Sequence, residues 1–104
     1  MPMTQRPFSY DLSPAGQTLT LHGEVDEAAS IELRDLLKAI TADLVGDLRI
    51  NLTDVDFLPS VAIGVLAAGR NAATQNGASV TFVAAEGSIS RRVLTICGIA
   101  CDDA

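Results

Sequence analysis

Ser60 is the side chain whose type and position in this chain best suit chemistry. A strand-like apolar run at residues 48–52 precedes it, and small and aliphatic residues follow it from position 61 to position 69. A strand that turns into a helix leaves free backbone N–H groups and the positive end of the helix dipole at the turn. The Ser60 hydroxyl could cap that helix, or it could accept a phosphate where a helix best tolerates negative charge. The residues alone leave both roles open.

The other polar candidates are less suited to catalysis. His22 alternates with apolar residues and is better interpreted as a partly exposed strand residue than as a catalytic base. Asp54 and Asp56 indicate a solvated turn rather than an acid/base pair or a metal site. Cys97 and Cys101 lack the second ligand pair that zinc requires, and we expect reduced thiols, with a disulfide or redox role as the alternative.

The sequence contains no HExxH, GxSxG or Walker motif. We therefore expect a binding or switching module and not an enzyme, with no catalytic residues, no cofactor and no metal.

Composition restricts the functional class further. The chain has 104 residues, 48% of them hydrophobic and only 4% aromatic, which predicts one domain with an aliphatic core. Its net charge of −6 argues against direct binding to nucleic acid. No apolar run is long enough to span a membrane, and the polar N-terminus has no signal-peptide core. A cytoplasmic location without membrane insertion is the expectation.

The hydrophobic pattern predicts an α/β fold with the order β-β-α-β-α-β-α. Alternation predicts strands at residues 8–12, 18–22, 48–52 and 79–84, with positions 54–56 in a connection. The first helix should begin after an Asp26 cap and end at Gly46, the second should run from about Ser60 to Gln75, and the third should lie between Ser88 and Gly98. These elements predict a mixed sheet of about four strands with helices packed on it.

The start of the second predicted helix is the best candidate for a binding surface. Pro59, Val61 and Ala62 are small or apolar, so a partner could approach closely. Gly64 and Gly69 in the same helix do not form a phosphate-binding loop. We expect them to permit close packing against the sheet or against a partner.

Four segments, taken in order, resemble the STAS domain family, which includes the bacterial anti-sigma factor antagonists. Residues 21–26 (LHGEVD) are similar to the family's L-x-G-x-x-D motif, and residues 48–57 are similar to its apolar strand followed by D-L-S-x-V-x-F. Residues 77–83 resemble G-x-x-L-x-L-V, and residues 92–99 resemble the V-x-R-x-L-x-x-x-G-L signature. The resemblance covers about residues 8–100.

The resemblance implies a phosphorylation site and a partner. In antagonists the strand-to-helix turn reads D-S-S-G-L-G or D-S-T-G-L-G, and the anti-sigma factor, a serine kinase that uses ATP, phosphorylates the first hydroxyl residue. Residues 59–64 (PSVAIG) occupy these positions, so Ser60 falls on the phosphorylated position and Pro59 replaces the acidic residue. The resemblance also implies partner contact by the segment that leads into the first helix. The expected partner-binding residues are Glu24, Asp26, Pro59, Ser60, Val61, Ile63 and Gly64.

The function implied is an anti-sigma factor antagonist that binds a kinase-type anti-sigma factor and regulates transcription by partner switching. The alternatives are a non-phosphorylated STAS subunit of an ABC-type lipid transporter and a ligand-sensing STAS module. Family members commonly continue with a further strand and helix, which this single domain of residues 1–104 lacks. We expect part of the first helix or the sheet edge to be less covered as a result, which could favour a homodimer or a partner.

Overall fold

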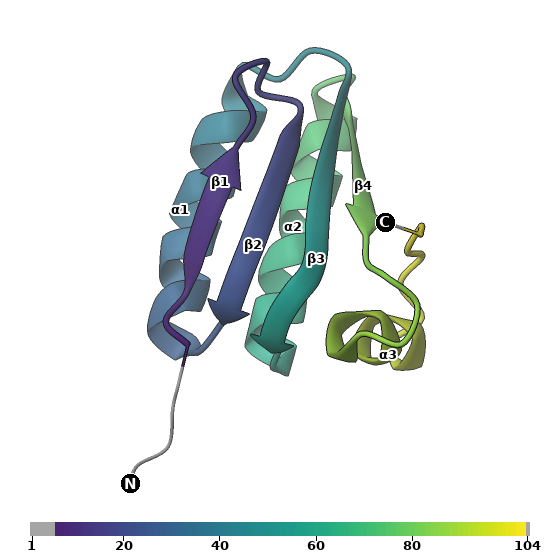
Figure 1. The fold of residues 1–104 in the computed structure, drawn as a ribbon. Helices are drawn as coiled ribbons and strands as arrows, with labels where there is room; N and C mark the ends of the chain where they lie inside the picture. The colour runs from purple at the N-terminus through teal and green to yellow at the C-terminus, as the bar shows by residue number, and fades with distance from the viewer. Residues whose placement is uncertain (1–5, 104) are drawn as a thin grey trace, which may run out of the picture.

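A four-stranded sheet with the strand order β1-β2-β3-β4 forms the centre of the structure (Figure 1). The computed structural model describes residues 6–103. The strands are β1 (Ser9–Leu12), β2 (Thr18–Glu24), β3 (Asp47–Phe57) and β4 (Ser79–Val83), and the helices are α1 (Glu27–Ala42), α2 (Ser60–Gln75) and α3 (Ile89–Ile96). β1 pairs antiparallel with β2, whereas β2, β3 and β4 run parallel. The predicted element order and mixed sheet are confirmed.

Helices α1 and α2 lie side by side on one face of the sheet, behind the strands as viewed in Figure 1. Alternation along β2 and β3 turns the leucine and isoleucine side chains toward these helices. The core is aliphatic, as the composition predicts, with Phe82 as its buried aromatic residue among the described positions. The largest fully buried aliphatic residues are Leu19, Leu21, Leu33, Leu48, Ile50, Leu52, Leu66 and Leu94.

Helix α1 begins as predicted and ends earlier than predicted. The Asp26 carboxylate accepts a hydrogen bond from the Ala29 N–H at 2.9 Å, which is the expected N-cap. The helix ends at Ala42, and residues 43–46 form the turn that leads into β3. Gly46, predicted as the end of the helix, instead adopts φ +86° in this turn, and its carbonyl accepts from the Ser79 N–H at 3.0 Å.

Strands β2 and β3 are longer than the pattern predicts. The expected connection at positions 54–56 is wrong, because Asp54 pairs with His22 and the parallel ladder continues to Glu24 and Phe57. Two register shifts interrupt this part of the ladder. Irregular pairing disturbs the alternation of polar and apolar residues, so the sequence pattern does not reveal the end of the strand.

The C-terminal segment runs along the free edge of β4. Asp102 forms a parallel bridge with Val83, its N–H donates to the Phe82 carbonyl at 2.9 Å, and its carbonyl accepts from the Ala84 N–H. Arg91 of α3 holds the same segment through the Asp103 carboxylate at 2.7 Å. None of the helices within residues 6–103 has the length and apolar character needed to cross a membrane.

Candidate functional site

The predicted binding residues gather where β2 and β3 end, at the lower edge of the sheet in Figure 1. Because the two strands are parallel, their carboxyl ends meet at the same edge. Glu24 pairs with Phe57, and the Val25 N–H donates to the Phe57 carbonyl at 3.0 Å. The segment leading into α1, with Asp26, therefore lies beside the segment leading into α2, with Ser60.

Ser60 is the first residue of α2 and not its cap. The N-cap is Pro59, with φ −75° and ψ 169° and no side-chain hydrogen bond, so of the two roles left open for Ser60 the capping role is excluded. The Pro59 carbonyl accepts from the N–H groups of Ala62 and Ile63 at 3.0 and 3.1 Å, which places the start of the helix one residue earlier than a serine cap would. The Ser60 side chain is left exposed.

The beginning of α2 also differs electrostatically from the other helix starts. Asp26 caps α1 and Ser88 caps α3 through their side chains, whereas α2 has neither a side-chain cap nor an acidic residue in its first turn. Its dipole end and free N–H groups are therefore not neutralised by a side chain of their own helix. A phosphate on Ser60 would supply negative charge at this helix end.

The apolar part of this surface comes from both sides of the strand-to-helix turn. Phe57 at the end of β3 is 48% exposed, and Val61 in the first turn of α2 is 50% exposed. Ile63 is only 8% exposed, because helical periodicity turns it toward the core with Leu66. The expectation that Ile63 offers its side chain to a partner is therefore corrected, and Phe57 is a surface residue that the sequence reasoning missed.

The two glycines of α2 have different surroundings. A Cβ atom at Gly64 would meet nothing within 4 Å, so no packing inside the domain requires a glycine there. A Cβ atom at Gly69 would lie 2.9 Å from Leu37 Cδ1 of α1. The close packing expected of these glycines therefore occurs at Gly69, against α1 and not against the sheet, whereas Gly64 is open to a partner.

A cluster of charged side chains lies next to this surface, and the sequence reasoning missed it. His22 Nδ1 is 2.7 Å from Asp54 Oδ2, and His22 Nε2 is 3.0 Å from Asp11 Oδ2. Arg6 donates to Asp54 at 2.6 Å and to Asp56 at 2.9 Å. The signal available in the sequence was the β-α-β order, because such a unit usually forms a parallel pair and brings the ends of the strands near His22 and Asp54 to one edge of the sheet.

These contacts shift the titration of the cluster. The hydrogen bond with Asp54, followed by that with Asp11, raises the pKa of His22 above its usual value. The hydrogen bond from Arg6, followed by that with His22, lowers the pKa of Asp54. The cluster is therefore a network of ion pairs centred on Asp54, which contacts both Arg6 and His22. This arrangement differs from the solvated turn expected around Asp54 and Asp56.

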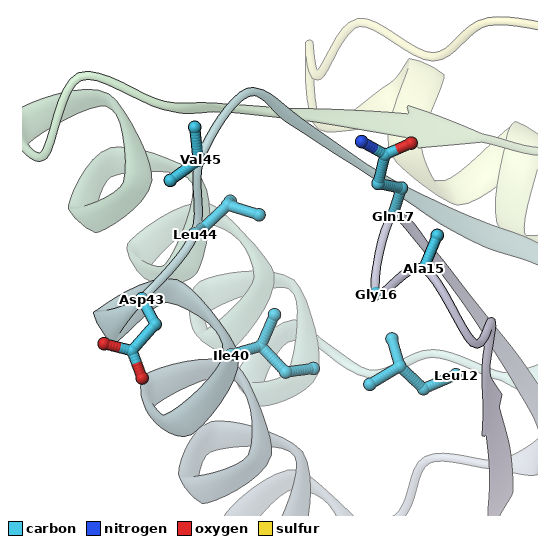
Figure 2. Close-up of a pocket in the computed structure, with 8 residues that line it drawn as sticks. All are labelled: Leu12, Ala15, Gly16, Gln17, Ile40, Asp43, Leu44 and Val45. Carbon is cyan, nitrogen blue, oxygen red and sulfur yellow. The ribbon is translucent and has the colours of Figure 1, made fainter.

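The remaining candidates lie away from Ser60. A hollow of about 360 Å³ lies between the β1–β2 turn and the end of α1, at the opposite end of the sheet, and Leu12, Ile40 and Leu44 point into it (Figure 2). Cys97 is exposed and Cys101 is half-buried, both are free, and burial raises the pKa of the Cys101 thiol. Across residues 6–103, the His, Cys, Asp and Glu side chains form no group suited to holding a metal ion.

Comparison with protein families matches residues 8–100 to the model described as "Mlab, STAS domain". The chain is also 35% identical over 82 residues to the anti-sigma-F factor antagonist RsfB of Mycobacterium tuberculosis, in the strains H37Rv and CDC 1551 / Oshkosh. The matched region covers 78% of this chain but 65% of each relative, so the chain spans less than two thirds of their length.

Two solved structures share the fold. The unphosphorylated anti-sigma factor antagonist SpoIIAA superimposes with a TM-score of 0.74 at 16% identity, covering 94% of this chain and 88% of that one. An anti-sigma factor antagonist from Mycobacterium paratuberculosis gives a TM-score of 0.74 at 24% identity, covering 92% and 84%. At these identities the likeness supports the fold.

Proposed function

This chain belongs to the STAS domain family, and we propose that it is an anti-sigma factor antagonist whose partner binding is controlled by phosphorylation of Ser60. The observation that carries the proposal is the exposed hydroxyl of Ser60 at the uncapped start of α2, beside Glu24 and Asp26. The names of the relatives, which are anti-sigma factor antagonists, support the class of partner. The chain acts as a regulatory binding protein in the cytoplasm, and its partner supplies the kinase activity.

In the unphosphorylated state, the exposed side chains of Phe57 and Val61 provide the apolar contact. Gly64 contributes an open backbone surface, so a partner can approach this turn of α2 closely. Glu24 and Asp26 place carboxylates at the edge of the same surface, which favours a partner with basic residues there.

Phosphorylation changes the charge of this surface. The partner's kinase centre transfers the γ-phosphoryl group of ATP to Ser60 Oγ: an O–P bond forms as the bond to ADP breaks, and the hydroxyl proton passes to a base of the kinase. The product carries about 1.5 to 2 negative charges at neutral pH. The start of α2 stabilises this charge within the free antagonist. In the complex the phosphate would have to be desolvated beside an apolar contact, so the complex dissociates.

Three variants test the proposal against a purified candidate anti-sigma kinase. Wild type should be phosphorylated by ATP and bind the kinase, Ser60→Ala should bind without being phosphorylated, and Ser60→Asp should bind at least about tenfold more weakly, the effect of roughly 1.4 kcal/mol. Gln75→Glu is the matched control, because it adds one negative charge to the opposite, exposed end of α2. Phosphorylation of Ser60→Ala, or equal affinities of wild type and Ser60→Asp, would contradict the proposal.

A Gly64→Leu variant tests the binding surface separately from the phosphate. Its side chain has space within the domain, so the circular dichroism spectrum should be unchanged while partner binding weakens. Loss of the folded spectrum would show that Gly64 serves the fold and not the partner.

Pro59 supports a second candidate function. It stands at the N-cap without a side-chain hydrogen bond, where antagonists carry an acidic residue. A kinase that recognises an acidic side chain at this position would not phosphorylate this chain, because Pro59 has no carboxylate. The candidate is then a STAS subunit of an ABC-type lipid transporter that binds its ATPase constitutively. Capture of the same transporter ATPase from lysate by wild type and by Ser60→Asp would favour this function.

A further inference from the structure

We propose that His22 is a pH-dependent latch that holds the edge strand β1 to the rest of the sheet. The inference is independent of the proposed function, because it rests on the ring geometry of His22 and on the position of β1. Within residues 6–103, strand β1 has β2 as its neighbour on one side and ends the sheet on the other, and all four of its residues are exposed.

Both ring nitrogens of His22 face carboxylate oxygens, from strands on either side of β2. Nδ1 faces Asp54 of β3 at 2.7 Å, and Nε2 faces Asp11 of β1 at 3.0 Å. An ionised carboxylate can only accept hydrogen bonds, so both nitrogens must donate at once. Only the imidazolium form carries a proton on each nitrogen. The arrangement therefore requires the charged ring, and this ring connects β1, β2 and β3.

The charges around the ring favour the protonated form. Asp11 faces it from β1, Asp54 and Asp56 come from β3, and Glu24 follows on the same face of β2. Arg6, from the segment before β1, is the opposing cation, and it is already bound to Asp54 and Asp56. The His22 side chain is 28% exposed, so its proton can exchange with solvent.

Loss of the proton weakens the side-chain contact to β1 and not the one to β3, while the backbone pairing of β1 with β2 remains. A neutral imidazole has one donor and one acceptor nitrogen, so one of the two carboxylates must lose its hydrogen bond. The shorter contact, Nδ1 to Asp54, keeps the remaining proton, and Asp54 is also held by Arg6. The lone pair of Nε2 then faces Asp11, and the contact to β1 becomes repulsive.

The latch thus operates in the pH range where histidine changes charge, between about pH 5 and pH 8. Because the pKa of His22 is raised, the ring contacts both Asp11 and Asp54 in the lower part of this range. The contact to Asp11 is lost as the pH rises. Leu12 at the end of β1 lines the hollow beside α1, so a more mobile β1 would also affect this hollow (Figure 2).

NMR of the untagged protein tests the latch, because His22 is the single histidine of the sequence. The ring should titrate above its ordinary value of 6.5, with both nitrogens protonated below that pH. Amide–water exchange in β1, corrected for the intrinsic effect of pH, should speed up roughly three- to tenfold as His22 deprotonates, as loss of one hydrogen bond weakened by solvent exposure implies. The amide–water exchange rates in β4 should not change as His22 deprotonates.

Two variants and a control complete the test. His22→Gln cannot titrate, and Asp11→Asn offers an amide that can pair with either form of the ring, so β1 exchange should lose its pH dependence in both. Asp47→Asn removes a charge at the far end of β3 and should leave the dependence intact. A His22 pKa at or below 6.5, or β1 exchange that ignores the charge of His22, would overturn the proposal.

Discussion

Gly69 of α2 lies so close to Leu37 of α1 that a Cβ atom at position 69 would stand 2.9 Å from Leu37 Cδ1. The two helices pack side by side at this contact, and Leu37 is only 2% exposed beneath it. Gly64, one and a half turns earlier in α2, has open space where its Cβ atom would be. Two glycines that look equivalent in the sequence therefore have different structural roles.

Alanine substitution should separate these roles. Gly64→Ala should raise the free energy of unfolding by about 0.5–1 kcal/mol, because alanine is the better helix former and meets no neighbour. The free energy of unfolding of Gly69→Ala should be about 1 kcal/mol lower than that of Gly64→Ala, because Leu37 must move in a packed core to make room for the new Cβ atom. Urea unfolding measures both variants. Equal stabilisation by the two substitutions would show that the helices do not pack as closely as Gly69 indicates.

Gly23 and Gly16 form a second matched pair. Both have positive φ, at +83° and +72°, so alanine strains the backbone at either position by about 1 kcal/mol. A Cβ atom at Gly23 would in addition collide with the Pro7 carbonyl oxygen, whereas Gly16 has nothing within 4 Å. Gly23→Ala should therefore destabilise by a further 1–3 kcal/mol or so, the cost of overpacking. A similar urea midpoint for both variants would mean that the Arg6–Pro7 backbone moves away from a Cβ atom at position 23 with no loss of stability.

Ser60→Asp should stabilise the isolated domain. The first turn of α2 contains no acidic residue, so the new carboxylate interacts favourably with the helix dipole, by about 0.3–1 kcal/mol at low salt. The Gln75→Glu control should be neutral or slightly destabilising, because it adds charge of the same sign at the opposite end. Thermal unfolding at low and high salt measures both effects. A destabilised Ser60→Asp would mean that weaker partner binding reflects damage to the fold.

The stability contributed by the charged cluster should depend on pH in a defined direction. The pKa of His22 is raised in the folded protein, so its contribution is complete below the unfolded value of about 6.5 and is lost as the pH rises through the folded pKa. The pKa of Asp54 is lowered, so its contribution is complete above the unfolded value of about 3.9 and is lost as the pH falls through the folded pKa.

The free energy of unfolding of wild type should therefore exceed that of His22→Gln by most between about pH 4 and pH 6.5. This difference should shrink toward about pH 8. Urea unfolding across this pH series measures the difference. A difference that grows as the pH rises would contradict the raised pKa of His22.

The sequence by itself determined the features that depend on neighbours along the chain. The Asp26 cap, the α2 bounds at Ser60 and Gln75, and the element order all follow from periodicity, capping chemistry and turn residues. These signals act over one or two helical turns or one strand, so a single sequence contains them.

Only the tertiary structure decided the features that depend on register between distant segments. Asp54 meets His22 across 32 positions of sequence, in a ladder with irregular pairing that no local pattern encodes. The rotation of α2 on the sheet buries Ile63 and exposes Val61. The position of Pro59 as the cap depends on where β3 ends, and β3 ends where its pairing with β2 ends. Such contacts form when the chain packs, because their free energy comes from groups that the sequence places far apart.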